Sequence, residues 1–559
     1  MRPCTTTRRG FLKDAALAIA AAATPRLALS AGAPTGRLPT KRPERPNIVL
    51  ILCDDMGFSD IGCYGGEVNT PNLNRLAAGG VRFSQFYNSA RCCPTRASLL
   101  TGLHPHQAGI GWMTADLGYP GYYGALNDRC VTIAEVLKQA GYRTCASGKW
   151  HVGSRPGTHP LDRGFDAYYG LIDGACNYFR PKKGIFRGRT RVKIPTDGSY
   201  YTTDAFTDQA VQFVDKAGRD EDKPFFLYLA YTAPHYPIQA WQQDIDKYRG
   251  KYMKGWDKIR DARHKRLIEL GLIDPKWKLS PRDRRNPAWD TLSDADKDWR
   301  DLLMATYAAM IDRMDQGIGR VLAKLKEVGA EENTLVMFLS DNGGCPYTNK
   351  PDKPKRGADG KIVPTSTPDM EYTYGWAWAN ASNTPFRRYK QHTHEGGIAT
   401  PFIAYWPGVI KPGGVTHQVG HIVDVMATCA EVAGTRYPAS FEGRSLTPLE
   451  GKSLASVFQG RQREGHDHLC WQHNGARAIR KGKWKLVARN EKPASWELYD
   501  IEADRTELND LARAHPDTVK ELSALYQKWA DRVGVVPLDE LKKRKRERKK
   551  RKQGGGKRK

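Results

Sequence analysis

The sequence predicts an α/β fold: a large, mixed but mostly parallel sheet between helices, followed by a small C-terminal α+β subdomain with an antiparallel sheet. Three observations support this prediction. Short apolar runs alternate with segments of helical periodicity, several of these runs end in charged side chains, and the pattern changes beyond about residue 435. At 559 residues, 40% of them hydrophobic, the chain is long enough to bury such a core.

Four apolar runs have the composition of buried parallel strands. They span residues 47–53, 142–146, 224–231 and 334–340. Each is followed by side chains that can carry charge or bind a ligand, namely Asp54, Asp55, Lys149, His151, His235, Asp341 and Asn342. Ligands of open α/β sheets bind at the carboxyl edge of the strands, so we expect these side chains to share one site.

Helices are predicted between the strands. Thr132 and Glu135 have the spacing of a capping box at a helix start. A longer apolar face recurs at helical spacing from about Leu302 and stops near Gly329. Beyond about residue 435, the predicted elements are strands at 476–487 and 496–500 and a helix at 516–532.

The N-terminus has the features of an export signal. Arg8 and Arg9 precede the short apolar stretch 15–23, which resembles a twin-arginine signal peptide. This predicts export through the twin-arginine machinery to the periplasm or the cell exterior. No run elsewhere reaches the roughly 18 apolar residues that a bilayer span requires. We therefore expect no transmembrane segment in the mature chain.

The net charge of +27 is concentrated at the C-terminus. Residues 542–559 hold 13 Lys/Arg against one Glu. Such a run predicts a disordered, solvated tail, with binding of polyanions or of a membrane surface as the alternative. Because so much of the charge lies in this tail, the basic pI does not indicate a specific nucleic-acid partner. The cysteines show no paired zinc pattern and no dense disulfide framework.

Two acidic pairs predict a metal site. Asp54-Asp55 and Asp341-Asn342 each follow an apolar strand. Three carboxylates and an amide oxygen suit Ca²⁺ or Mg²⁺ and disfavour zinc, which prefers nitrogen and sulfur. Either pair alone is weak evidence because Asp and Asn are common in turns; the repeated position after a strand strengthens the prediction.

The segment 92–102, Cys-Cys-Pro-Thr-Arg-Ala-Ser-Leu-Leu-Thr-Gly, predicts a loop that enters a helix with Pro94 in its first turn. The free amides and the dipole at a helix start favour an anion. Arg96 adds a permanent cation that suits a sulfate or phosphate oxyanion. From these residues alone, Cys92 is an ordinary thiol nucleophile or a structural cysteine.

The same segment resembles the signature of the type I sulfatases of the alkaline-phosphatase superfamily, Cys-x-Pro-x-Arg followed by Leu-Thr-Gly. Further segments resemble motifs of that family, at 148–153, 233–237, 340–344 and 383–397. The resemblance extends over about residues 45–535, and the insertion around 247–272 resembles the arylsulfatase branch. Cys53 departs from the small residue expected before Asp54, a change that should not disturb the metal.

The resemblance implies hydrolysis of a sulfate ester of a small molecule or glycan. A modifying enzyme would oxidise Cys92 to formylglycine; Cys93 lacks Pro and Arg at the required offsets. The implied catalytic residues are Cys92, Arg96, Lys149, His151, His235 and Lys390. The implied metal ligands are Asp54, Asp55, Cys92, Asp341 and Asn342, with Ca²⁺ preferred over Mg²⁺. His392 and His394 are expected to line the pocket.

The resemblance also implies individual roles. Lys149, Lys390 and Arg96 stabilise the sulfuryl oxygens. His235, assisted by Lys390, protonates the leaving alcohol, and His151 then removes a proton from the hydrated aldehyde so that sulfate departs. Lys149 and His151 are two residues apart, so an extended chain would direct both to one face.

The predicted domains are a twin-arginine-type signal peptide (1–33), a linker (34–46), a catalytic sulfatase domain (47–435), a C-terminal subdomain (436–535) and a basic disordered tail (536–559). Two alternatives stay open on the same scaffold. One is a phosphate or phosphonate monoester hydrolase with the same nucleophile. The other is a glycan-binding protein without catalysis, against which the intact Cys92, Arg96 and metal pairs argue.

Overall fold

The computed structural model describes residues 45–219, 222–347, 353–490 and 495–555. The predicted signal peptide, 1–33, and most of the predicted linker, 34–46, lie outside these ranges. Within them, no helix combines the length and the apolar composition needed to cross a bilayer.

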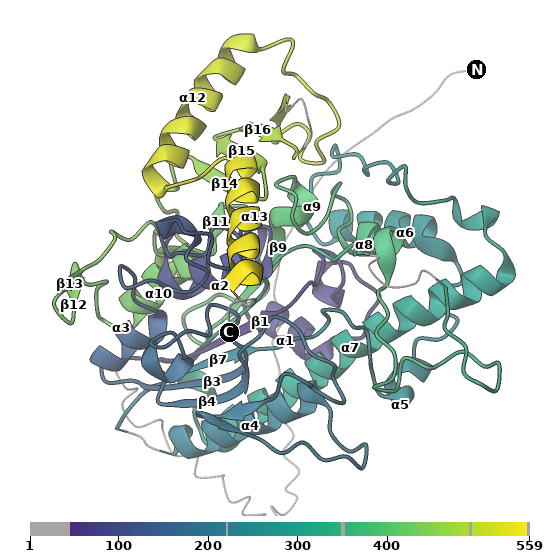
Figure 1. The fold of residues 1–559 in the computed structure, drawn as a ribbon, viewed down its shortest axis with the longest axis horizontal. Helices are drawn as coiled ribbons and strands as arrows, with labels where there is room; N and C mark the ends of the chain where they lie inside the picture. Colours follow the sequence, from purple (N-terminus) through teal and green to yellow (C-terminus); the bar gives the residue numbers. More distant parts are fainter. Residues whose placement is uncertain (1–44, 220–221, 348–352, 491–494, 556–559) are drawn as a thin grey trace, which may run out of the picture. The chain divides into compact units, whose positions relative to one another are not determined.

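The described residues form one eleven-stranded mixed sheet (Figure 1). In spatial order its strands are β10 (Gly414–Thr416), β2 (Val81–Tyr87), β9 (Ala399–Tyr405), β8 (Thr334–Ser340), β1 (Asn47–Cys53), β7 (Phe225–Ala230), β3 (Arg143–Lys149), β4 (Ala167–Leu171), β5 (Phe186–Arg187) and β6 (Thr190–Arg191), with β11 (Gly420–His421) also on β2. The four predicted strands are β1, β3, β7 and β8, which are neighbours and run parallel. The predicted fold class is confirmed.

The register of these strands brings their carboxyl ends to one level. Cys53 of β1 pairs with Ser340 of β8, so Asp54 and Asp341 follow side by side. Ala230 of β7 pairs in the same way with Gly148 of β3. The side chains that follow the strands therefore start from one edge, as expected for a parallel sheet.

Helices cover both faces of the sheet because the central strands are apolar on both sides. In β1, Val49 and Ile51 face one core and Leu50 faces the other. The first core includes α1 (Pro71–Gly79), α4 (Thr202–Gly218) and α7 (Asp294–Glu327), and the second includes α2 (Cys92–Thr101), α3 (Ile133–Gln139) and α10 (Asp424–Val432). Further helices of this domain are α5 (Gln242–Asp246), α6 (Gly255–Glu269), α8 (Gly375–Ser382) and α9 (Glu395–Ile398).

Two helix starts test the sequence patterns. The capping box of α3 is present, since the Thr132 hydroxyl accepts from the Glu135 amide and the Glu135 carboxylate accepts from the Thr132 amide. Helix α7 begins at Asp294, eight residues before the predicted start. The Ser293 hydroxyl caps it by accepting from the Asp296 amide at 3.1 Å, and the buried Trp299 extends its apolar face.

The C-terminal subdomain contains the expected antiparallel sheet. Its strands are β14 (Leu469–His473), β15 (Ala476–Lys481), β16 (Trp484–Ala488) and β17 (Trp496–Asp500), and α12 (Pro516–Val533) packs on them. The predicted strand 476–487 is a hairpin that turns at Gly482, whose φ is 56°. Its left-handed backbone is one that glycine adopts without strain.

Residues just after the predicted boundary at 435 belong to the large domain by packing. They form β12 (Ser440–Phe441), β13 (Arg444–Ser445) and α11 (Ala455–Phe458). Leu454 and Phe458 are buried in the same core as Leu50 of β1. The small separate core instead begins with β14.

The predicted disordered tail, 536–559, is described up to residue 555 and is mostly helical there. Residues Leu538–Gly555 form a helix, α13. Leu541 is buried against Leu117 and Tyr122, and the Tyr119 hydroxyl donates to Glu540 at 2.5 Å. Composition alone favoured disorder, but Leu541 and Glu540 contact a surface of the large domain that is distant in the sequence.

Candidate active site

Cys92 is the first residue of α2, with Arg91 in extended backbone at the N-cap position and Pro94 in the first turn. The Cys92 side chain is only 3% exposed. The first turn holds no acidic side chain. The free amides of a helix start and its positive dipole end therefore act on the Cys92 position, as predicted.

Lys149 and His151 both reach this position, but by a different route from the predicted extended pair. Lys149 is the last residue of β3, and His151 has a φ of 55°, so the chain turns between them. A ring nitrogen of His151 lies within 4.8 Å of the sulfurs of Cys92 and Cys93, as those sulfurs do of each other. The turn, rather than strand alternation, brings His151 to the nucleophile.

The surroundings of Cys92 favour an anion there. A hydrogen bond involving the Cys93 thiol is the largest influence, and it holds the pKa of Cys92 well below its usual value. Burial acts in the opposite direction, while the charges of Lys149 and Lys390 lower that pKa further. Negative charge is thus stabilised at position 92.

The two predicted metal pairs meet at the carboxyl edge of β1 and β8. The Asp55 amide donates to Asp341 Oδ1 at 3.2 Å, and Asn342 Nδ2 donates to Asp55 Oδ1 at 2.7 Å. Asp54, Asp341 and Asn342 are fully buried and Asp55 is 1% exposed. Buried carboxylates in such numbers require nearby cations.

Three basic side chains provide that compensation. Arg96 Nη2 lies 3.0 Å from Asp341 Oδ2 and 3.6 Å from Asp54 Oδ2. Lys149 contacts Asp54 and Lys390 contacts Asp55 through their ammonium groups. The predicted site residues therefore form one connected cluster of opposite charges.

Electrostatics within the cluster favours the ionised forms of Asp54 and Lys390, whereas burial and the charge of Asp54 raise the pKa of Asp341 well above its usual value. Burial opposes the charge on Asp54, but Lys149, His235 and Arg96 outweigh it and hold its pKa well below the usual value. Burial likewise disfavours the charged Lys390, but Asp55 raises the pKa of that ammonium well above its usual value.

Several buried oxygen atoms of the cluster have no hydrogen-bond partner: Asp54 Oδ1, Asp55 Oδ2 and Asn342 Oδ1. Unpaired buried oxygens are costly, and a hard cation is the ligand that two carboxylates and an amide carbonyl suit. Both oxygens of Asp341 already accept hydrogen bonds, from the Asp55 amide and from Arg96. The donor set thus fits a Ca²⁺ or Mg²⁺ ion.

His235 faces the same cluster from the end of β7. Its Nδ1 lies 2.5 Å from the Tyr236 carbonyl, which fixes Nδ1 as the donor. Its Nε2 is left 3.4 Å from Asp55 Oδ2. Burial lowers the pKa of His235, against the charges of Asp55 and Asp54. His235 can therefore hold a proton at Nε2, facing Asp55, inside the site.

His473 is a buried histidine that the sequence patterns did not identify and whose pKa responds to the charges of Arg91 and Cys92. It ends β14 and is fully buried, and neither ring nitrogen has a hydrogen-bond partner among the described residues. Burial holds the pKa of His473 well below its usual value, with Arg91 adding to this effect and Cys92 opposing it. Only folding brings β14 to the start of α2, so no local pattern points to His473.

His392 and His394 differ in their surroundings from the expected pocket lining. His394 is 1% exposed, and its Nε2 lies 3.0 Å from Glu497 Oε2 in β17. His392 packs beside it, with 6.3 Å between the ring centres. His394 therefore joins the active-site loop to the C-terminal sheet.

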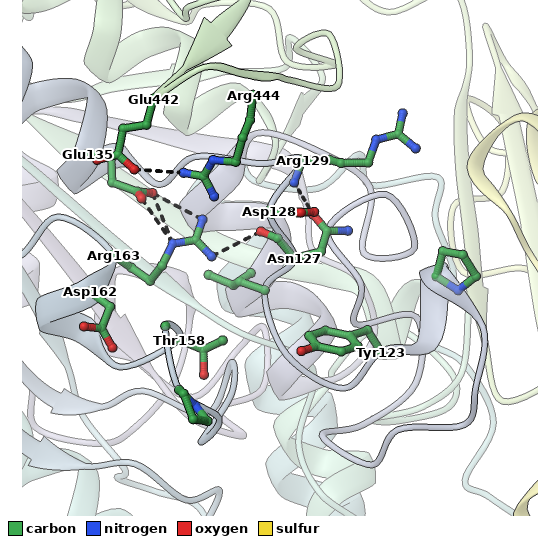
Figure 2. Close-up of a pocket in the computed structure, with 14 residues that line it drawn as sticks. Tyr123, Asn127, Asp128, Arg129, Glu135, Thr158, Asp162, Arg163, Glu442 and Arg444 are labelled. Atoms are coloured by element: carbon green, nitrogen blue, oxygen red, sulfur yellow. Dashed lines mark hydrogen bonds and ion pairs between the residues drawn. The ribbon is translucent and has the colours of Figure 1, made fainter.

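A separate cavity of about 630 Å³ contains none of the predicted site residues. Figure 2 shows it between Tyr123, Arg163 and Arg444. Arg163 pairs with Glu135 at 3.2 Å, so the charges in this cavity compensate one another. It offers no reacting group comparable to the cluster at Cys92.

Comparisons with known proteins agree with this geometry. The sulfatase family model matches residues 46–435, and a model of the C-terminal part of N-sulphoglucosamine sulphohydrolase matches residues 387–530. An arylsulfatase of Klebsiella aerogenes is 35% identical over 76% of this chain and 95% of its own length. Human N-acetylgalactosamine-6-sulfatase is 30% identical over 74% of this chain and 67% of its own length.

Among solved structures, Ps i-CgsB in complex with k-i-k-neocarrahexaose superposes with a TM-score of 0.65 at 27% identity, covering 87% of this chain and 93% of that one. The family model alone spans well over half of the chain. The chain therefore belongs to the type I sulfatases of the alkaline-phosphatase superfamily and is a sulfuric ester hydrolase.

Proposed function

We propose that this enzyme is an exported sulfatase that cleaves a sulfate ester to an alcohol and sulfate, with formylglycine made from Cys92 as nucleophile and Ca²⁺ as cofactor. The observation that carries the proposal is the position of Cys92 at the start of α2, beside His151 and against the charged cluster. In this reading the Cys92 sulfur marks where the oxygens of the hydrated aldehyde would lie. That hydrate supplies one hydroxyl to attack sulfur and a second whose deprotonation releases sulfate.

The residues that would hold Ca²⁺ are Asp54, Asp55, Asp341, Asn342 and the modified residue 92. When bound, the ion would supply fixed positive charge against the sulfate oxygens. The three unpartnered oxygens support this assignment. Calcium is preferred over magnesium because it accepts irregular sets of oxygen ligands, whereas magnesium demands near-ideal octahedral geometry.

The chain's own side chains perform the remaining work. Lys149, Lys390 and Arg96 surround the position where charge develops on the sulfuryl oxygens and stabilise it. His235 gives a proton to the leaving oxygen from Nε2 in its imidazolium form, whose charge Asp55 and Asp54 favour, while its Nδ1–H stays on the Tyr236 carbonyl. His151 takes the proton from the second hydroxyl, because it lies next to residue 92.

The proposed substrate is a sulfated glycan or a small sulfate ester. Relatives named as an arylsulfatase and an N-acetylgalactosamine-6-sulfatase support both classes. The neighbouring structure that contains k-i-k-neocarrahexaose favours a glycan. The pair Arg8-Arg9 before a short apolar stretch supports export in folded form.

The test combines mass and turnover. The tryptic peptide with Cys92 should be lighter by about 18 Da than its unmodified form, the change from thiol to aldehyde. Cys92→Ala should lower turnover of nitrophenyl sulfate by at least about 10³-fold. Cys93→Ala, a change of the same size at the next residue, should keep the mass change and the activity.

Two results would contradict the proposal. Active enzyme with an unmodified Cys92 would exclude the formylglycine route. Faster turnover of nitrophenyl phosphate than of nitrophenyl sulfate would assign the site to a phosphomonoesterase instead.

A further inference from the structure

We propose that the exposed cations of α13 form a binding surface beside the active site for further sulfate groups of a polysulfated glycan. This inference rests on the proposed function and names its substrate class. The cations belong to the basic run at residues 542–559, which takes no part in the proposed reaction.

Helix α13 presents an excess of unpaired positive charge. Its exposed basic residues are Lys542, Lys543, Lys545 and Arg546. None of these makes an ion pair with any residue that the structure describes, whereas Arg548 pairs with Asp116 at 2.9 Å. Surface cations without acidic partners are available to an anionic ligand, and several of them together create a local positive potential.

The helix is held against the large domain, so this charge has a defined position. Leu541 is 1% exposed and packs on Leu117 and Tyr122. The pairing of Arg548 with Asp116 fixes a second point along the helix, just under two turns further on. In Figure 1, α13 (yellow) extends from beside the C-terminal sheet towards the large domain.

One chain of contacts leads from this surface to the nucleophile. The Lys545 ammonium lies 5.4 Å from the ring centre of Trp112. The Trp112 carbonyl lies 3.6 Å from the sulfur of Cys93, and Cys93 adjoins Cys92 in the first turn of α2. A single loop therefore separates the basic helix from the start of α2.

A second chain of contacts arrives from the C-terminal sheet. The first residue of α13, Leu538, packs so closely on the β14–β15 turn that a Cβ on Gly475 would lie 2.9 Å from its Cδ2. Two residues before that glycine stands His473, which is buried next to the charges of Arg91 and Cys92. The amino end of α13 thus contacts the hairpin that carries His473, and Lys545 contacts the loop that carries Trp112.

The chemistry favours a glycan over a membrane. The only apolar residues of α13 are Leu538 and Leu541, and Leu541 faces the protein. A helix that lies in a membrane interface needs an exposed apolar face, which α13 lacks. A sulfated polysaccharide instead offers a row of anions, of which one would enter the site while its neighbours meet the helix.

The test uses the full-length enzyme and dextran sulfate as the polysulfated probe, with uncharged dextran beside it. The probe should inhibit hydrolysis of nitrophenyl sulfate, and its inhibition constant should rise with salt. The quadruple variant K542Q/K543Q/K545Q/R546Q should raise that inhibition constant about tenfold. Each exposed ion pair with the probe is weak, but the four contributions to the binding free energy add. The variant keeps Leu541, so kcat and KM for nitrophenyl sulfate should not change.

A matched control removes four exposed lysines at the opposite edge of the sheet, in the variant K216Q/K223Q/K326Q/K411Q. These positions flank the amino ends of β7 and β8 and the end of β9. The control should leave the inhibition constant unchanged.

Binding of both variants to phosphatidylserine vesicles is measured in parallel. Three outcomes would overturn the inference. They are equal inhibition constants for dextran sulfate in both variants, no inhibition of the wild type, or a quadruple variant that loses vesicle binding but keeps the wild-type inhibition constant. Failure of the proposed function is seen separately, as absent turnover before any probe is added.

Discussion

Glu395 is the centre of a buried ion network that joins the active-site loop to the C-terminal subdomain. Its carboxylate accepts from Lys485 Nζ at 2.7 Å, from Arg505 Nε at 2.8 Å and from the Tyr87 hydroxyl at 3.0 Å. Glu395, Lys485 and Arg505 are fully buried. The network is anchored five residues after Lys390, so we expect Glu395→Gln to weaken both the fold and the support of that lysine.

The magnitude follows from the pKa of Glu395. Burial opposes its ionisation, but Lys485 and Arg505 outweigh burial and lower this pKa from 4.5 to about 2. Such a shift corresponds to about 3 kcal/mol of stability at neutral pH. Breaking a buried pair by removing one partner costs a similar 3–5 kcal/mol, roughly. Glu395→Gln should therefore lower the free energy of unfolding by about 3 kcal/mol.

The assay is urea unfolding at pH 7 and at pH 4, followed by fluorescence. Because the pKa is lower in the folded state, the stabilisation is complete above about pH 4.5 and is lost as the pH falls towards 2. The difference between wild type and Glu395→Gln should accordingly shrink at pH 4. Glu521→Gln is the control: Glu521 pairs with Lys481 at 2.7 Å but is 60% exposed, so it should cost less than about 1 kcal/mol. Equal losses in both variants, or a difference independent of pH, would refute the argument.

The remaining predictions concern the reaction. His235→Ala should slow hydrolysis of a sugar sulfate by about 10²–10⁴-fold and hydrolysis of nitrophenyl sulfate much less, because nitrophenolate departs without a proton. Equal losses of rate on both substrates would contradict the assignment of His235 as the general acid. His151→Ala should release one burst of nitrophenol and then stall, and a linear time course would contradict this. Dialysis against a chelator should abolish turnover, and Ca²⁺ but not Zn²⁺ should restore it. His473→Leu should not lower stability, since no hydrogen bond is lost, yet should raise KM for a sugar sulfate; an unchanged KM would place His473 outside the substrate site.

The sequence predicted the parts of the site that depend on local pattern. Each of the four central strands shows itself as a short apolar run, and the side chains that follow it must lie at one edge of a parallel sheet. The start of α2 was also predicted from the sequence, because Pro94 and the small residues around it favour the first turn of a helix. These patterns suffice to collect Asp54, Asp341 and Lys149 in one place.

The parts that the sequence did not predict depend on contacts between distant segments. His151 reaches Cys92 through a left-handed backbone conformation, which no spacing rule anticipates for a histidine. The helix α13 is held by contacts with segments far away in the sequence, such as Leu541 with Leu117 and Arg548 with Asp116. No local sequence pattern identifies His473, because its surroundings depend on how the C-terminal sheet packs on the large domain.

The residues that local patterns predict and those that they miss differ in their place in the fold. The groups proposed for the chemistry, such as Asp54 and Lys149, stand at strand ends within the large sheet, where the backbone is rigid and their positions are set by register. The groups His473 and α13, outside this sheet, belong to the last 90 residues of the chain: His473 ends β14 of the C-terminal subdomain, and α13 contacts both the β14–β15 turn and the large domain. The ion network at Glu395 fixes that subdomain to the loop of Lys390. A change in the C-terminal subdomain could therefore alter which sulfate ester binds without moving the residues that cleave it.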